Sequence, residues 1–405
     1  MSLRAKRAPS LAPGLGALSL AAALAACATT TPSAPQPQAP MVPPGGAAVT
    51  TRDGVTPPFM AGRTIVRVGL LLPFSTRPQE AAALYNAAEL ALFDHGGPST
   101  LLIPRDAGAN SETAAAAARA LLSDGANIII GPVTREGVEG AASAAARNRV
   151  PVIGFSSDRT VAGSGVYLLS FQLEDEVSRL VSFAAARGLR TVALLAPDNE
   201  YGRRVEAALR AEAARQGMSV TAAERYTRTD AEAGAAAGRL AATLSATPAQ
   251  GIVIADSGTT LRAIGPALVR GGVDPRRVRL LGTSVWAGDA QREPTFAGGW
   301  YVSPDPRVRT DFEARYQAIF HSEPTRLSSL AYDAVALSAL LSSDRGAAGF
   351  TPQAIQRNDG FLGSDGIFRF RSNGSIQRGL AIMEVRPNDA TPVDPAPRRF
   401  TGPAG

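Results

Sequence analysis

Few side chains of this sequence could carry covalent or metal chemistry. Among its 405 residues there is one cysteine, Cys27, there are two histidines, His95 and His321, and Lys6 is the sole lysine. Neither histidine has cysteine or paired acidic neighbours at the spacing of metal ligands. No Gly-x-Ser-x-Gly motif is present, and a P-loop would need a lysine that the rest of the chain lacks. The sequence therefore predicts a protein that is not an enzyme and that uses no metal or cofactor.

The single cysteine ends an N-terminal segment that has the order of a bacterial export signal. A basic start is followed by an apolar stretch at 11–24 and then by a leucine, two alanines and Cys27. This order resembles the lipobox of bacterial lipoproteins, in which the cysteine is acylated and becomes the first residue of the mature chain. The resemblance implies a signal peptide at 1–26, a membrane anchor at Cys27 and, with Ala28 next, the periplasmic face of the outer membrane. An ordinary cleaved signal with a chance cysteine is the alternative.

The two ends of the chain differ in composition from its middle. Removal of residues 1–26 takes away three basic side chains and lowers the net charge from +6 to +3. No run of basic residues remains, which argues against a nucleic-acid partner. Residues 27–62 are rich in Pro and Ala and poor in large apolar side chains, so they predict a disordered tether. Residues 387–405 have a similar composition and predict a flexible tail.

Between these ends, short apolar runs alternate with longer amphipathic stretches. Strands are predicted at 65–72, 101–103, 128–130, 150–153, 191–196, 219–223, 252–254 and 278–281. Helices are predicted at 79–94, 110–125, 136–147, 201–216, 231–245, 260–270, 310–320 and 327–341, and a hairpin at 366–370 and 376–385. Fully apolar strands separated by helices predict parallel sheets covered on both faces. The pattern restarts once, and the length suits two lobes, so the fold class is α/β with two doubly wound parallel-sheet lobes.

Several segments, in this order, are similar to one family. They are Asp-Gly-Ala-Asn-Ile-Ile-Ile-Gly-Pro at 124–132, the strand and loop at 150–158, Asp-Asn-Glu-Tyr-Gly at 198–202, and Phe-Leu-Gly at 361–363 with its hairpin. They resemble the type I periplasmic binding proteins, which include the branched-chain amino-acid receptors. The resemblance covers a domain at 63–386. It implies a first lobe at about 63–170 plus C-terminal helix segments, a second lobe at about 171–300 plus the closing hairpin, and a ligand cleft between them.

The resemblance also implies which residues line that cleft. In the first lobe they are Thr134, Arg135, Phe155, Ser156, Ser157 and Asp158, and in the second lobe Tyr201, Asp256, Ser284 and Trp286. Ser156 and Ser157 would donate to a ligand carboxylate or merely stabilise a loop or helix cap. Tyr201 would stack on the ligand, Trp286 would form a pocket wall or a core aromatic, and Arg135 would clamp a carboxylate or remain solvated. Arg159 would pair with its neighbour Asp158.

One position departs from the pattern of the amino-acid receptors. They place an acidic residue in the loop after the strand that ends near 281, where it pairs with the ligand ammonium. Ser284 stands at the matching position here. Unless Asp256 or Asp289 substitutes, an ammonium in the cleft would lack a counter-charge, which is costly in a closed site. Tight binding of a free aliphatic amino acid is therefore less expected than in the receptors.

Two functions follow from these resemblances. Phe-Ser-Ser-Asp-Arg at 155–159 together with the lipobox resembles the penicillin-binding-protein activator lipoproteins, which stimulate a peptidoglycan synthase. The first expectation is therefore an activator-like regulator of peptidoglycan synthesis, which would sense a small amino-acid or peptide ligand. The alternative is the substrate-binding component of an ABC importer for amino acids or related solutes, with a permease as its partner. Fold similarity alone does not separate the two.

Overall fold

The computed structural model describes residues 56–60, 62–400 and 402. The predicted signal peptide, Cys27 and the predicted tether up to residue 55 lie outside the described residues. Within the described residues, no helix is both long and apolar enough to cross a membrane. The short 3₁₀ helices of this part are Pro58–Met60, Ala146–Asn148, Arg159–Val161, Ser284–Trp286, Ala290–Arg292, Pro294–Phe296 and Gly346–Gly349.

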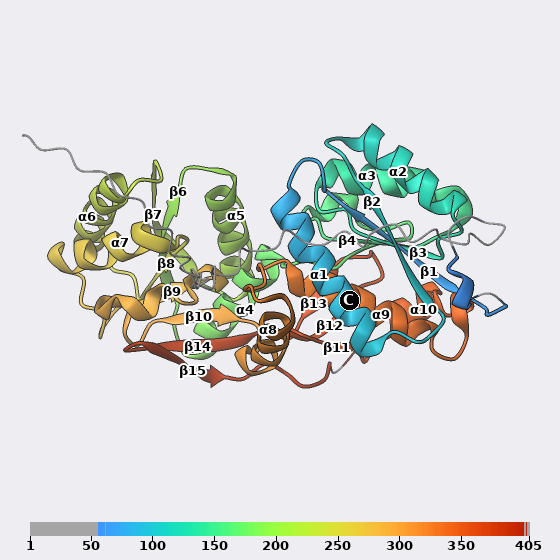
Figure 1. The fold of residues 1–405 in the computed structure, drawn as a ribbon. Coiled ribbons are helices and arrows are strands. Elements are labelled where there is room, and N and C mark those ends of the chain that lie inside the picture. Colours follow the sequence, from blue (N-terminus) through green and yellow to red (C-terminus); the bar gives the residue numbers. More distant parts are fainter. Residues whose placement is uncertain (1–55, 61, 401, 403–405) are drawn as a thin grey trace, which may run out of the picture. The chain divides into compact units, whose positions relative to one another are not determined.

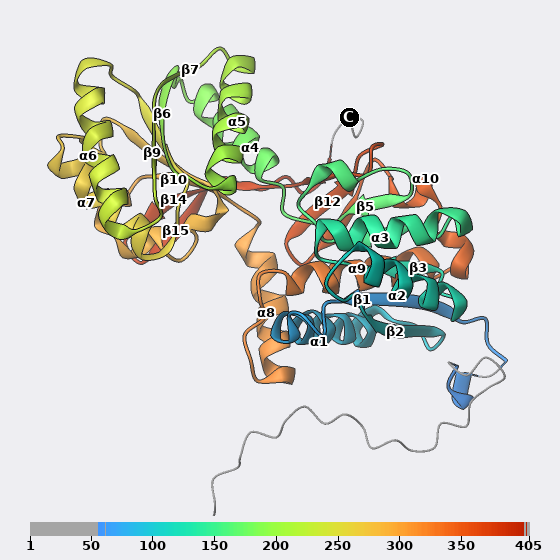
Figure 2. The same cartoon turned by 90° about the horizontal axis from the view of Figure 1, so that it is seen from above.

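The first lobe is built on a five-stranded parallel sheet with the strand order β2-β1-β3-β4-β5. Its strands are β1 (Val66–Leu72), β2 (Thr100–Asp106), β3 (Ile128–Ile130), β4 (Val152–Gly154) and β5 (Val166–Leu168). Its helices are α1 (Pro78–His95), α2 (Ser111–Ser123) and α3 (Arg135–Ala145). Because the strands are apolar on both faces, both faces must be covered. One core lies between the sheet and α1, and the other lies between the sheet and α2 and α3 (Figures 1 and 2).

The second lobe is built on a seven-stranded mixed sheet with the order β15-β14-β10-β9-β8-β6-β7. Its strands are β6 (Thr191–Pro197), β7 (Ser219–Tyr226), β8 (Gly251–Ile254), β9 (Arg279–Gly282), β10 (Trp300–Ser303), β14 (Ala381–Arg386) and β15 (Asp389–Asp394). Its helices are α4 (Leu173–Ala186), α5 (Glu200–Arg215), α6 (Asp230–Ala246) and α7 (Gly258–Arg270). Helices α4 and α5 bury one face of this sheet, and α6 and α7 bury the other. The predicted α/β fold with two parallel-sheet lobes is confirmed.

The chain after β10 returns to the first lobe before it ends in the second. Helices α8 (Pro306–Phe320), α9 (Ser328–Ser342) and α10 (Pro352–Ile355) precede a small antiparallel sheet of β11 (Phe361–Gly363), β12 (Gly366–Phe370) and β13 (Ile376–Arg378). Helix α9 packs against α1, and Figure 2 shows the two helices side by side. The Phe370 ring lies 5.5 Å from the ring of Tyr167 at the end of the first sheet.

The closing hairpin differs from its prediction. The sequence predicts one strand at 376–385 that belongs to the second lobe, whereas the structure splits it at Gly379 between two sheets. Strand β13 pairs with β12 beside the first lobe, and β14 pairs antiparallel with β10 in the second lobe. The reason is where the side chains are buried, because Phe368 and Ile376 belong to the first-lobe core and Ile382 to a second-lobe core.

The structure also orders part of the segment predicted as a flexible tail. Residues Asp389–Asp394 form β15, which pairs antiparallel with β14. Arg179 of α4 donates from Nη2 to Asp394 at 2.7 Å. The outer edge of β14 would otherwise present unpaired N–H and C=O groups. A segment poor in large apolar residues can therefore form an edge strand, because its backbone pairs with the open edge of β14.

Four charged side chains meet where the chain passes between the lobes, and we call them the buried charge cluster. Arg309 comes from α8, Asp333 from α9, Asp365 from the turn after β11, and Arg378 from the end of β13. Asp333, Asp365 and Arg378 are all buried. Arg309 donates from Nη1 to Asp365 at 2.8 Å, and Arg378 donates from Nε to the carbonyl of Ser170 at 3.0 Å. These contacts join segments that are distant in sequence.

The buried charge cluster makes stability depend on pH. Burial raises the pKa of Asp333 from 3.8 to about 7, and the charge of Asp365 adds to the rise. Between pH 5 and 7 the native state therefore keeps a proton that the unfolded chain has lost. Because the native state binds more protons, the free energy of unfolding should fall as the pH rises, by about 2–3 kcal/mol between pH 5 and 8.

Asp333→Asn should remove this part of the pH dependence. Urea unfolding of both proteins at pH 5, 6, 7 and 8 measures the effect. Between pH 5 and 8, the free energy of unfolding should fall by about 2–3 kcal/mol more in wild type than in the variant. Identical slopes for the two proteins would refute the assignment.

Candidate functional site

Two loops of the first lobe leave the adjacent carboxyl ends of β3 and β4. Thr134 follows β3 and caps α3, because its Oγ1 accepts the N–H of Gly137 at 3.1 Å. Ser156 and Ser157 follow β4. Ser156 is buried and its Oγ accepts the N–H of Asp158 at 3.1 Å, so its hydroxyl stabilises the loop. Ser157 is exposed, which leaves its hydroxyl accessible to a ligand.

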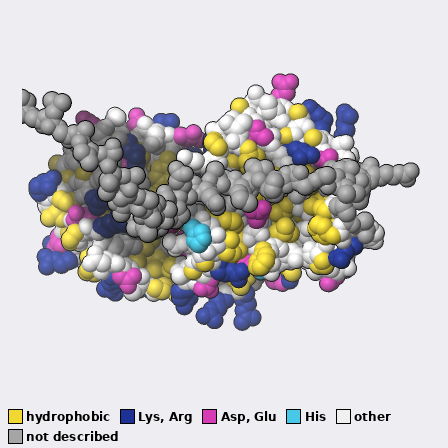
Figure 3. Space-filling model, in the orientation of Figure 1, with side chains coloured by type: hydrophobic (Ala, Val, Ile, Leu, Met, Phe, Trp, Pro, Cys, Tyr) yellow, Lys and Arg dark blue, Asp and Glu magenta, His cyan; other side chains and the backbone are white. Residues whose placement is uncertain are grey.

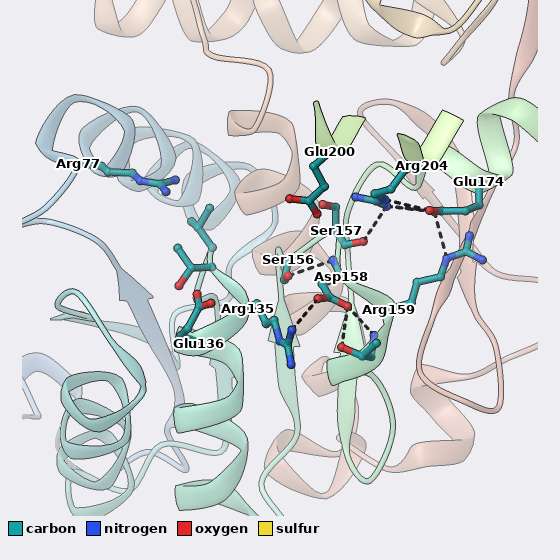
Figure 4. Close-up of a pocket in the computed structure, with 13 residues that line it drawn as sticks. Arg77, Arg135, Glu136, Ser156, Ser157, Asp158, Arg159, Glu174, Glu200 and Arg204 are labelled. Carbon is teal, nitrogen blue, oxygen red and sulfur yellow. Dashed lines mark hydrogen bonds and ion pairs between the residues drawn. The ribbon is translucent and has the colours of Figure 1, made fainter. Parts of the chain in front are cut away.

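A cavity of about 660 Å³ opens beside these loops. We call it the charged cavity, because four arginines and four acidic residues line it (Figure 4). They are Arg77, Arg135, Arg159, Arg204, Glu136, Asp158, Glu174 and Glu200. The structure thus brings together five of the predicted site residues: Thr134, Arg135, Ser156, Ser157 and Asp158.

The Arg135 guanidinium is already paired within the chain. Its Nε lies 3.0 Å from Glu139, and its Nη1 lies 3.5 Å from Asp158. Hydrogen bonds from Thr160, with a smaller contribution from the Arg135 charge, lower the pKa of Asp158. A ligand carboxylate would have to compete with two carboxylates for Arg135. The predicted pairing of Arg159 with Asp158 is wrong, since Arg159 donates to Asp175 at 2.7 Å instead.

Arg204 of α5 is a site residue that the sequence did not predict. Its Nη2 donates to both carboxylate oxygens of Glu174, at 2.9 and 3.2 Å, and it reaches the carbonyl of Ser157 at 3.4 Å. Figure 4 shows this arginine between Ser157 and Glu174. Arg204 therefore links the loop after β4 in the first lobe with the first turns of α4 and α5.

A second cavity of about 320 Å³ shares Val133, Ser157 and Arg204 with the first. We call it the Tyr201 cavity. Most of its lining surface is apolar, although six of its thirteen lining residues are polar or charged. Beside the three shared residues, the lining consists of Phe155, Ser170, Phe171, Leu173, Glu176, Tyr201, Ser284, Val285, Arg326 and Leu327. Three more predicted residues, Phe155, Tyr201 and Ser284, are thus placed in a cavity. An apolar lining with a few polar groups is the usual composition of a small-molecule site.

Tyr201 stands at the start of α5, directly after β6. Asn199 caps this helix by accepting the N–H of Gly202 at 3.0 Å. The Tyr201 hydroxyl lies 2.7 Å from Oγ1 of Thr283, and burial raises the pKa of the phenol. The ring is therefore held in one orientation and its hydroxyl stays protonated.

Glu176 is the acidic residue of the Tyr201 cavity, and it is not among the residues predicted from the sequence. It lies in the first turn of α4 and is buried. Its carboxylate accepts the N–H of Ser284 at 3.0 Å and the hydroxyl of Ser284 at 2.8 Å. Burial raises the pKa of Glu176, and the nearby Arg326 charge opposes that rise. One sequence feature could have indicated this residue. The acidic run Glu-Asp-Glu at 174–176 is typical of the first turn of a helix, and it forms the first turn of α4.

Two predicted site residues lie in neither cavity. Trp286 is fully buried among the second-lobe helices, and its indole N–H donates to the carbonyl of Ile254 at 2.9 Å. Asp256 is also buried, and accepts from the Tyr226 hydroxyl at 2.7 Å and from Arg228 at 2.9 Å. Both side chains support the second lobe instead of lining a pocket, so the core alternative holds for Trp286.

Basic and acidic side chains both occur on the part of the face in Figure 3 that the grey residues leave visible. Among the described residues there is no group of three histidine, cysteine or acidic side chains that could hold a metal ion.

Comparison with known proteins agrees with the fold described above. A family model described as periplasmic binding protein matches residues 65–390. No curated protein sequence matches the chain. A putative branched-chain amino acid ABC transporter from Rhodospirillum rubrum shares the fold at 17% identity, with a TM-score of 0.71 over 81% of this chain and 100% of that one.

Two further solved structures contain ligands. An ABC transporter substrate-binding protein from Desulfitobacterium hafniense, in complex with Leu, is 18% identical with a TM-score of 0.60, over 81% of this chain and 99% of that one. An ABC transporter solute-binding protein from Rhodopseudomonas palustris, in complex with 3,4-dihydroxybenzoic acid, is 17% identical with a TM-score of 0.58, over 84% and 98% of the two chains. Because the family model matches most of its length and these structures share its fold, the chain belongs to the periplasmic binding protein family.

Proposed function

We propose that this protein is the solute-binding component of an ABC importer and that it takes a small solute with a carboxylate group. The observation that carries the proposal is the Tyr201 cavity, where Ser157 of the first lobe and Tyr201 of the second line one space. The importer alternative fits the relatives better than the activator reading, because those named above are described as ABC transporter proteins. Family membership implies a periplasmic location and a permease as partner, while anchoring through Cys27 remains a prediction.

The loop groups of the first lobe suit an anionic ligand. Neither the N–H of Ser156 nor that of Ser157 donates a hydrogen bond within the described part of the chain. The N-terminus of α3 adds its positive dipole end nearby. Leucine and 3,4-dihydroxybenzoic acid, the ligands of two relatives, have a carboxylate in common. A carboxylate held by Ser157 and these N–H groups, with Tyr201 over the ligand body, is therefore the arrangement we propose.

Ser157→Ala should weaken binding of such a carboxylate about ten- to a hundredfold, because a charge-assisted hydrogen bond contributes about 1.5–3 kcal/mol. Tyr201→Ala should weaken binding further by removing the ring that would stack on the ligand. A thermal-shift screen of amino acids and simple carboxylates selects the ligand, and calorimetry measures the affinities. Ser343→Ala, which changes the exposed serine directly after α9, is the matched control and should bind like wild type. No binding by any compound, or equal binding by all variants, would refute the proposal.

A further inference from the structure

The Tyr201 cavity contains an internal ion pair between Arg326 and Glu176. Arg326, in the segment before α9, donates from Nη2 to the Ser284 hydroxyl oxygen at 2.7 Å and lies 3.4 Å from the Glu176 carboxylate. Ser284 in turn donates its hydroxyl to Glu176 at 2.8 Å. Arg326, Ser284 and Glu176 thus form a closed chain of hydrogen bonds, which we call the Arg326–Glu176 pair.

Aromatic stacking holds Arg326 in this position. Its guanidinium carbon lies 4.7 Å from the centre of the Phe171 ring, whose other contact of this kind is the buried Arg378, also at 4.7 Å. A guanidinium stacked on an aromatic face is attracted by the ring quadrupole and loses side-chain freedom. Arg326 remains about half exposed, with 47% of its side chain accessible, whereas Glu176 keeps only 7%. The exposed end of the pair is therefore the cation.

The Tyr201 cavity offers no unpaired carboxylate to an ammonium group. Glu176 is the one acidic residue among its lining side chains, and of the two basic ones Arg204 is paired with Glu174 and Arg326 with Glu176. The Glu176 carboxylate already accepts two hydrogen bonds from Ser284 and faces Arg326. An ammonium group would have to displace Arg326 from a buried carboxylate or remain beside its positive charge without a partner, and both are unfavourable in a partly desolvated site.

We propose that the Arg326–Glu176 pair makes this cavity selective for small carboxylates that have no amino group beside the carboxylate. The body of such a ligand would contact the aromatic and aliphatic lining, with Phe155, Phe171, Tyr201 and Leu327 as its apolar walls. Arg326 takes the place of the ligand ammonium, and Ser284 holds Glu176 in the orientation that receives it. The inference rests on the proposed solute-binding function and narrows its ligand class.

The test compares ligands that differ only in the amino group. Leucine with 4-methylpentanoate, and phenylalanine with 3-phenylpropanoate, are titrated into the full chain by calorimetry. Wild type should prefer the compound without the amino group at least tenfold in one of the pairs. Arg326→Gln removes the cation that faces Glu176, so it should shift the ratio of the two affinities at least tenfold toward the amino acid. Arg326→Lys should retain the wild-type preference.

Two further variants locate the effect. Adding Glu176→Gln to Arg326→Gln should cancel the gain for the amino acid, because no carboxylate remains to receive an ammonium. Arg239→Gln, which changes an exposed arginine on α6, should leave the ratio at the wild-type value. Two results would overturn the inference and leave a solute-binding function standing. One is wild type binding the amino acid as tightly as the matching carboxylate without an amino group, and the other is an affinity ratio that does not change in Arg326→Gln. No binding of any of the four compounds to wild type or variant would overturn both.

Discussion

Replacing Arg378 by Met should lower the free energy of unfolding by about 3–5 kcal/mol, because it removes the cation beside the buried Asp333 and leaves Asp365 with Arg309 alone. The guanidinium is buried beside Asp333 and Asp365, and burial lowers its pKa. It also stacks 4.7 Å from the Phe171 ring and donates to the Ser170 carbonyl. Methionine keeps much of the volume but none of these polar contacts. Urea unfolding at pH 7.5 measures the loss.

The control for this prediction is Arg386→Met, which changes an exposed arginine paired with Glu384 at the end of β14. An exposed ion pair contributes about 0–1 kcal/mol, so this variant should unfold close to wild type. Adding Asp333→Asn to Arg378→Met should recover part of the lost stability by removing the carboxylate that has lost its cation. Equal stability of Arg378→Met and Arg386→Met would contradict the role given to the buried charge cluster.

Replacing Trp286 by Ala should lower the free energy of unfolding by about 3–5 kcal/mol, as expected for truncating a fully buried aromatic side chain. The indole packs edge-on against Phe296 with ring centres 4.9 Å apart, and fills the space above Gly282. A Cβ on that glycine would lie 2.1 Å from the indole, so the site accepts no larger residue. The variant loses this packing together with the hydrogen bond to Ile254.

The same variant separates a core role from a pocket role for Trp286. At a temperature where Trp286→Ala is still folded, its ligand affinity should equal that of wild type, since the side chain lines neither cavity. Phe93→Ala is the surface control, because Phe93 is 82% exposed on α1 and should affect stability by less than about 0.5 kcal/mol. A stable Trp286→Ala protein with weakened binding would restore Trp286 to the ligand site.

Local patterns predicted most of the strands and helices, and they failed where distant contacts decide the outcome. The three isoleucines at 128–130 form β3 as predicted, because a short run of β-branched apolar residues followed by glycine is typical of a buried strand in a parallel sheet. Strands β5 and β10 and helix α4 were not predicted. The division of the hairpin between two sheets at Gly379 depends on which core receives each side chain, and a local pattern contains no such information.

The candidate site shows the same contrast between residues that local patterns predict and residues that distant contacts bring together. Residues directly after strands of the first lobe, such as Ser157, were predicted from the order of motifs and do line a cavity. Position after a strand did not distinguish the cavity-lining Ser284 from the buried Trp286 two residues later. Glu176 and Arg326 were missed because they come from α4 and from the segment before α9, and only the folded chain brings them to Ser284.

The proposed binding mode can be checked by a crystal structure of the protein with its tightest-binding carboxylate. We expect one ligand in the Tyr201 cavity, with its carboxylate within hydrogen-bond distance of Ser157 and of free N–H groups in the same loop, and with its body against the Tyr201 ring. A ligand bound elsewhere, for example in the groove beside Leu362 between α8 and β11, with the Tyr201 cavity unoccupied, would refute the proposed binding mode.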